Sequence, residues 1–304
     1  MFIKSVLLVI SVLVGVAFLT LFEQKILSYS QSRKGPVKVG YKGILQPFSD
    51  ALKLFSKEVV LPYMSNLYIY FFAPVLSLGV VLAVWMIYPS FMGEEEISLS
   101  IIFMMSCLSV GVYALLAAGW ASNSKFALLG GLRAVAQTIS YEVNFSLILL
   151  SFIVLAMSFD FEVFMVYSDS WLGFVAPFLA MAWFISSLAE TSRTPFDFSE
   201  GESEIVSGFN TEYSSGPFAL FFLAEYGSIL FMSLVFSVIF MGGVDGDFFF
   251  YLKIGLILFM FIWVRSTLPR LRYDKLMDLS WLVFLPISIS YLLFFVGLMM
   301  SLGV

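Results

Sequence analysis

The sequence predicts an all-α, polytopic membrane protein, and two observations support this fold class. Hydrophobic residues make up 61% of the chain and charged residues only 12%, far from the averages of water-soluble domains. The apolar residues also occur in long continuous runs. In lipid every backbone polar group needs an internal partner, so helices and closed barrels are the possible folds. Continuous runs, rather than alternating apolar and polar residues, favour helices.

Eight apolar runs predict eight transmembrane helices within a single integral membrane domain, residues 1–304. Their approximate ranges are 2–22, 66–90, 99–120, 134–157, 171–190, 217–241, 249–265 and 281–302. Pro74, Pro177 and Pro286 fall inside these runs, where we expect ordinary packing kinks. The chain has no repeat period and no boundary to a soluble domain.

The first two helices are separated by a long loop, residues 23–65, which carries an amphipathic helix over about 47–59. Phe48, Leu52 and Phe55 recur at helical spacing there, and Pro47 suits a helix start. This pattern is typical of a helix that lies in the membrane interface. The loop before it is basic and rich in turn residues. A ligand with a polar head and a long apolar tail could enter beside this helix, although the basic residues alone fix topology equally well.

The distribution of Lys and Arg predicts the orientation in the membrane. Fourteen of the sixteen basic residues lie in the first, third, fifth and seventh connections, and only Lys4 and Lys253 lie on the other side. By the positive-inside rule, the odd-numbered loops face the cytoplasm or the mitochondrial matrix, and both termini face the opposite side.

Three carboxylates lie in or beside the predicted spans: Glu142, Glu190 and Glu225. Two of them follow or precede a tyrosine, Tyr141 or Tyr226. An ionisable group at membrane depth is costly, so it is a candidate functional residue. A protonated glutamate that merely packs helices is the alternative for each one. Three together favour a proton path.

The fifth connection, residues 191–216, is acidic. Its carboxylates are opposed by Arg193 alone, and they are Asp197, Glu200, Glu202, Glu204 and Glu212. An exposed charged loop is the ordinary interpretation. However, the loop lies on the otherwise basic side and is interspersed with aromatic and aliphatic residues. Carboxylates buried together cannot all ionise, so the sequence favours a cluster that takes up and passes on protons.

The chain contains no histidine and one cysteine, Cys107. We therefore expect no disulfide, no metal site and no iron–sulfur ligation in this chain. It also lacks a phosphate-binding P-loop and the strand context of a dinucleotide fingerprint. We expect no nucleic-acid partner.

Long motifs along the whole chain resemble the subunit 1 family of the NADH dehydrogenases of respiratory complex I, in its mitochondrially encoded form. These motifs are FEQK (22–25), SRKGP (32–36), QPFSDALKLF (46–55), GGLRAVAQTISYE (130–142), LAETSRTPFD (188–197), EGESE (200–204), GFNTEY (208–213) and LPRLRYD (268–274). One departure is visible, because Gln24 stands where the family pattern usually has arginine.

The resemblance implies a subunit of the mitochondrial inner membrane that acts on ubiquinone as substrate. It implies a quinone chamber lined by Glu23, Gln24, Lys25, Arg33, Asp50, Lys53, Phe55, Arg193, Phe209 and Arg272. The carboxylates and tyrosines named above would form a path from this chamber toward proton-pumping subunits. FMN and iron–sulfur clusters would belong to partner subunits. The partners would be quinone-site peripheral subunits, neighbouring membrane-arm subunits and lipid, and the isolated chain would have no activity.

Two other classes of protein stay open at this stage. A stand-alone secondary transporter, coupled to protons or cations, would also place carboxylates at mid-membrane. It would typically show internal repeats and paired broken helices. A purely structural membrane anchor is the third class, disfavoured by the cost of three intramembrane glutamates.

Overall fold

The computed structural model describes residues 2–88, 99–167, 172–199, 201, 206–242 and 248–303. Throughout these residues the regular structure is helical, which confirms the predicted fold class. The helices are α1 (Phe2–Ser30), η1 (Tyr41–Gly43), α2 (Gln46–Ser56), α3 (Leu67–Trp85), α4 (Ser100–Ala121), α5 (Lys125–Ala156), α6 (Phe161–Tyr167), α7 (Leu172–Val175), α8 (Pro177–Glu190), η2 (Gly208–Glu212), α10 (Ser215–Met241), α11 (Phe248–Thr267), α12 (Tyr273–Asp278), the π-helical turn η3 (Leu279–Phe284) and α13 (Leu285–Leu302).

Seven helices in the described part of the chain are long and apolar enough to cross a membrane. They correspond to seven of the eight predicted spans, with α12, η3 and α13 joined in one continuous helix. The fifth predicted span, 171–190, is different. Its described part consists of the short α7 and the 14-residue α8, which begins at Pro177. The predicted count of eight is therefore approximate.

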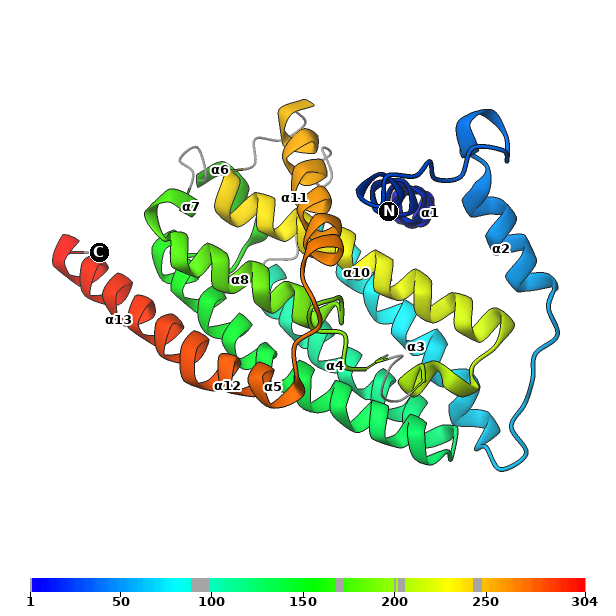
Figure 1. The fold of residues 1–304 in the computed structure, drawn as a ribbon. Coiled ribbons are helices and arrows are strands. Elements are labelled where there is room, and N and C mark those ends of the chain that lie inside the picture. The colour runs from blue at the N-terminus through cyan, green and yellow to red at the C-terminus, as the bar shows by residue number, and fades with distance from the viewer. Residues whose placement is uncertain are drawn as a thin grey trace.

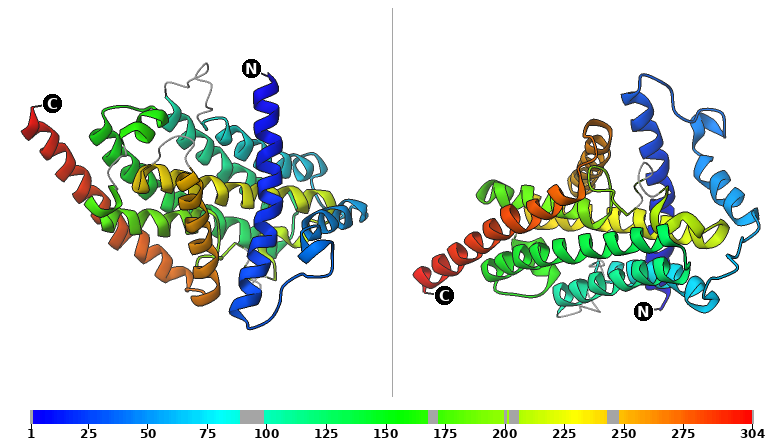
Figure 2. Two further views of the ribbon diagram at one scale, coloured as in Figure 1. Left: turned by 90° about the horizontal axis from the view of Figure 1, so that it is seen from above. Right: turned by 60° about the horizontal axis from the view of Figure 1, so that its bottom comes forward.

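The helices α3, α4, α5 and α10 run roughly alongside one another and form the body of the molecule (Figure 1). The first helix, α1, crosses this body steeply and packs against α10 and α11, as Figure 2 shows. The amphipathic α2 lies at the edge, beside α1 and the start of α10. The outer faces of the long helices carry exposed apolar side chains, as a lipid or protein neighbour requires.

Close helix packing in the body depends on small residues. On α4 and α5, Gly119 and Gly131 face each other, and a Cβ on Gly131 would lie 3.3 Å from the Gly119 Cα. Small residues at such a crossing let two backbones approach, which is how helices gain packing energy in lipid. Farther along α5, this helix packs on α8 through the stacked rings of Phe145 and Trp183, whose centres are 3.8 Å apart.

Two helix boundaries differ from the prediction in ways that matter for the site. The first helix continues to Ser30, so Glu23 lies on a helix and not in a loop. Its side chain is buried although it interrupts the hydropathy pattern. Likewise α5 begins at Lys125, nine residues before the predicted start at 134, and includes Arg133. The amphipathic helix was predicted over 47–59 and spans Gln46–Ser56.

Candidate functional site: a buried charged cluster and an adjoining cavity

The C-terminal end of α8 turns the chain so that Arg193 points back into the protein. The Arg193 backbone N–H donates to the Leu188 carbonyl at 3.1 Å, and the Ser192 N–H donates to the Ala189 carbonyl at 3.2 Å. Ser192 has a φ of 48°, in the left-handed region. These three features together are a Schellman motif, which ends a helix and satisfies its last carbonyls. The motif fixes where the Arg193 side chain starts.

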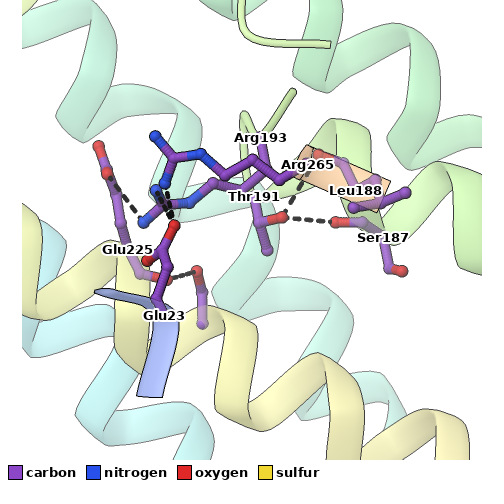
Figure 3. Close-up of polar contacts among 8 residues, drawn as sticks. Glu23, Ser187, Leu188, Thr191, Arg193, Glu225 and Arg265 are labelled. Carbon is purple, nitrogen blue, oxygen red and sulfur yellow. Dashed lines mark hydrogen bonds and ion pairs between the residues drawn. The ribbon is translucent and has the colours of Figure 1, made fainter. Parts of the chain in front are cut away.

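Arg193 lies between two carboxylates that belong to different helices. One guanidinium nitrogen is 3.9 Å from an oxygen of Glu23 on α1, and another is 3.9 Å from an oxygen of Glu225 on α10. Glu23 also forms an ion pair with Arg265 of α11. Figure 3 shows Arg193 and Arg265 converging on Glu23, with Glu225 on the other side of Arg193. The two acidic and two basic side chains balance in charge, as burial requires.

An aromatic ring completes this charged cluster, which consists of Glu23, Arg193, Glu225, Arg265 and Tyr226. The Arg193 guanidinium lies 4.4 Å from the centre of the Tyr226 ring. The Tyr226 side chain also lies near the carboxylate of Glu23. A planar guanidinium is suited to stacking on a ring while it contacts two carboxylates, which lysine cannot do. The cluster therefore selects arginine at position 193.

A cavity of about 120 Å³ adjoins the charged cluster. Most of its wall is apolar and comes from α3, α4 and α10, but two carboxylates, Glu190 and Glu225, line it as well. Its polar lining also includes hydroxyl groups, those of Ser77, Thr138, Thr191, Ser192 and Ser228. A space of this size has room for several water molecules, and the two carboxylates and the hydroxyl groups offer them hydrogen-bond partners. Glu225 thus belongs both to the charged cluster and to the cavity.

Glu142 lies beyond Glu190, toward the outer face of α5. The two carboxyl groups are near enough to interact electrostatically. Glu142 is half-buried, and its neighbours Ile139 and Val143 on the outer face are exposed. Tyr141 points elsewhere, since its hydroxyl donates to the Leu276 carbonyl of the C-terminal helix at 3.3 Å. Three carboxylates are therefore arranged in the order Glu225, Glu190 and Glu142.

The described part of the acidic loop is folded against neighbouring elements. Asp197 pairs with Arg270 at 3.1 Å, and the Leu271 N–H donates to the Pro195 carbonyl at 3.1 Å. From α5, the buried Gln137 amide donates to the carbonyls of Ala189 and Phe196, both at 2.8 Å. These bonds join the loop to the end of α8. Glu200, Glu202 and Glu204 lie outside the described residues.

In the last part of this loop, η2 packs on α5 and α4, and Tyr213 after it packs on α3. Phe209 is buried and lines the cavity. The rings of Tyr213 and Tyr70 stack at 4.3 Å, and the Tyr70 hydroxyl donates to the Glu212 carbonyl at 2.8 Å. Burial, and then the neighbouring Tyr70, raises the pKa of Tyr213 well above its usual value. The Tyr213 hydroxyl therefore stays protonated and donates to the Ala118 carbonyl.

The other predicted chamber residues do not join the charged cluster. Gln24, Arg33, Lys53 and Phe55 are exposed, and the ion pair of Arg272 with Asp274 lies at the surface. The Lys25 ammonium donates to the Lys42 carbonyl, and Asp50 accepts from Gln46. They lie around the loop between α1 and α2 and at the start of α12. If these residues line a quinone chamber, they do so from the outer surface of this chain.

Sequence reasoning missed two residues of the site, Arg265 and Gln137. Arg265 was counted only among the fourteen basic residues of the odd-numbered connections. A signal was available, because it directly follows an apolar run and a cation there can reach a buried carboxylate. Gln137 was missed because the candidates within the predicted spans were chosen by their ionisable side chains, and glutamine is uncharged.

These features define a class: a polytopic membrane protein that holds paired charges and further carboxylates in its interior, next to a partly polar cavity. The chain belongs to the NADH dehydrogenase family, whose model matches residues 3–296. It is 60% identical over 97% of its length to the NADH-ubiquinone oxidoreductase chain 1 of Anopheles gambiae, covering 95% of that protein. The chain 1 protein of Locusta migratoria is 56% identical, with 96% of this chain and 93% of that protein aligned. The chain 1 protein of Sminthopsis macroura is 46% identical, with 100% of this chain and 98% of that protein aligned. The family predicted from the sequence motifs is confirmed.

Proposed function

We propose that this chain is a membrane subunit of a proton-pumping NADH:ubiquinone oxidoreductase of the mitochondrial inner membrane. It helps to form the ubiquinone chamber and relays quinone chemistry to the proton-translocating part of the assembly. The family membership and the chain 1 relatives support the assembly. Iron–sulfur clusters would belong to partner subunits, because this chain has no histidine and a single cysteine to offer as ligands. We place the flavin in a partner subunit as well.

The observation that carries the relay is the double position of Glu225. It pairs with Arg193 in the charged cluster, and it lines the cavity that Glu190 also lines. A change of charge beside the cluster, such as quinone reduction produces, alters how strongly Arg193 attracts Glu23 relative to Glu225. Because Arg193 lies 3.9 Å from both, a small shift favours one pair over the other. Glu225 then binds a proton more or less readily.

Water in the cavity would carry the proton from Glu225 to Glu190, and the Glu142 carboxyl would receive it at the outer face of α5. Coupling requires that the cluster interacts differently with quinone and quinol, since a ligand shifts an equilibrium only through such a difference. The carboxylates of the acidic loop would supply protons at the other end of the path.

The test replaces Glu142 and Glu190 separately by glutamine, which keeps the size of the side chain and removes its proton-carrying carboxyl. We expect quinone-coupled turnover and proton pumping to fall by roughly tenfold or more, as the loss of a proton-transfer group does elsewhere. Reduction of an artificial acceptor that takes electrons before quinone should be unchanged. Glu162→Gln, on the short α6 away from the cavity lining, is the control. Normal pumping in both variants would overturn the assigned path.

Membership in the assembly has a separate test. We expect the chain to co-purify from mild detergent with flavin and iron–sulfur proteins. A free monomer or dimer with transport activity would instead indicate a secondary transporter.

A further inference from the structure

Two neighbouring serines tie the C-terminal end of α2 to the start of α10. The Ser215 hydroxyl donates to the Lys57 carbonyl at 2.8 Å and lies 3.2 Å from the Leu54 carbonyl. Next to it, the Ser214 hydroxyl accepts a hydrogen bond from the Val60 N–H at 2.9 Å. We call this pair the serine clamp. It closes contacts between residues more than 150 positions apart in the chain.

The clamp supplies a partner at the C-terminal end of α2, chiefly for the carbonyl of the cap residue Lys57, since the Leu54 carbonyl also accepts from the Lys57 N–H at 3.3 Å. The last four carbonyls of an α-helix have no partner within the helix. Lys57 follows α2 with an extended backbone, so α2 ends without a left-handed cap that would use these carbonyls. The Ser215 hydroxyl, which is buried, supplies a donor from another helix. The Ser215 hydroxyl thus caps α2 from another helix of the same chain.

Apart from the clamp, α2 is held weakly. At its N-terminal end Phe48 meets Phe18 of α1 edge to face, with ring centres 6.2 Å apart. Its outer face is open, with Leu52 71% and Phe55 59% exposed. A short helix with this little burial depends on its terminal contacts for its position.

The clamp is itself firmly anchored. It directly follows Tyr213, whose ring stacks on Tyr70 of α3 and whose hydroxyl bonds to the Ala118 carbonyl of α4. On the other side it begins α10, which carries Glu225 and Tyr226 of the charged cluster. The segment from Tyr213 to α10 therefore positions both α2 and the charged cluster.

We propose that Ser214 and Ser215 are positioning residues that fix α2 against the bundle and thereby hold its exposed apolar face, with Leu52 and Phe55, in place to receive a quinone with a long isoprenoid tail. The tail contacts this face, whereas a quinone with a short tail makes little contact with α2. This role in substrate use rests on the proposed function, but the fixing of α2 does not.

The first measurement is amide hydrogen exchange over residues 54–60 in the assembled oxidoreductase. Loss of one hydrogen bond should increase exchange there by about fivefold in Ser215→Ala and in Ser214→Ala. Ser214→Thr should behave like the natural protein, because it keeps the hydroxyl and its extended backbone, φ −131°, suits a β-branched residue. Ser233→Ala is the matched control, since that buried α10 hydroxyl bonds only within its own helix. Unchanged exchange in both clamp variants would overturn the inference.

The second measurement compares quinones with ten isoprenoid units and with one. In the two clamp variants the KM for the long-tailed quinone should rise about fivefold, the factor expected from the same lost bond. The KM and kcat for the short-tailed quinone should be unchanged, which a general loss of structure would not produce. If exchange rises and the KM ratio stays the same, the clamp stands and the proposed tail contact with α2 is overturned.

Discussion

At the scale of single residues, the charged cluster is governed by the cost of burying charge. Glu23 has 8% of its side chain exposed, and Arg193 12%. Such groups must be paired. Removing one partner leaves an uncompensated buried charge, and this costs more free energy than the intact pair contributes to stability. Glu23 pairs with two arginines, Arg193 in the turn after α8 and Arg265 on α11. Its replacement therefore affects both.

The pairing of Glu23 with Arg265 predicts a non-additive pair of substitutions. Glu23→Gln and Arg265→Gln should each lower the thermal stability of the assembled oxidoreductase, by roughly 2 kcal/mol, and the double variant should lose less than their sum. Thermal inactivation of quinone reductase activity measures this.

Arg272→Gln is the control for this cycle, because its ion pair with Asp274 is exposed at the surface and should contribute about 1 kcal/mol or less. Additive losses from the Glu23 and Arg265 substitutions would show that the two side chains act independently.

The sequence alone identified the carboxylates of the site but not their partners. Glu142, Glu190 and Glu225 were conspicuous because charge at membrane depth is costly. The contact of Glu23 with Arg265 joins residues 242 positions apart. Only the packing of α1 against α11 brings them together, and hydropathy contains no information about which helices are neighbours.

At the scale of helices and loops, the turn after α8 determines the direction of Arg193. Its left-handed residue is Ser192 and not the glycine that such turns prefer. A backbone held in this region costs free energy unless its side chain is small or absent.

The turn predicts opposite effects for two substitutions at position 192. Ser192→Gly should preserve activity, since glycine adopts a positive φ freely. Ser192→Val should cost about 1–2 kcal/mol and displace Arg193, because a β-branched residue resists this conformation. Quinone-coupled turnover, with the artificial acceptor as reference, reports the displacement. Equal activity in the two variants would contradict the role of the turn.

The packing of α5 against η2 predicts different effects for two glycine-to-alanine substitutions. A Cβ on Gly130 would lie 2.7 Å from the Gly208 Cα and 2.9 Å from the Phe209 backbone nitrogen, so the loop must move. We expect Gly130→Ala to destabilise this segment by about 1–3 kcal/mol. Gly79→Ala on α3 is the matched control, with no atom within 4 Å of the new carbon. Limited proteolysis of the loop distinguishes them, and equal cleavage rates would refute the close contact.

Hydropathy predicted the long helices well and the short ones poorly. The ends of α1 and α5 lie beyond the apolar runs because Glu23 and Arg133 continue the helix with polar residues that a hydropathy window excludes. The fifth span was predicted from composition, yet α8 has 14 residues, about 21 Å of helix, and begins at a proline. Helix length depends on such breaks and on neighbours as well as on composition.

At the scale of the whole molecule, the two chain ends lie toward the same side. Figure 2 shows them both away from the turn after α1. An even number of crossings would produce this arrangement, which requires the 14-residue α8 to cross in addition to the seven long helices of the described residues. On that count we expect the basic loops to share the opposite side.

The orientation predicts which side an impermeant thiol reagent reaches. In a Cys107→Ser background, Ser301→Cys should react from the intermembrane space and Lys34→Cys from the matrix, because the positive-inside rule places the basic loop there. Intact mitoplasts and inverted membrane vesicles give the two accessibilities. The reverse pattern would overturn the proposed orientation.

The cluster around Glu23 also has a consequence for biogenesis. A ribosome delivers α1 first, whereas Arg193 and Arg265 emerge much later. Until then the Glu23 carboxyl has neither guanidinium beside it, so during synthesis it must be protonated or remain near the lipid headgroups. We therefore expect the final seating of α1 to follow the insertion of α11. A prematurely terminated chain would keep its first helix too shallow, which gives membrane quality control a defect to recognise.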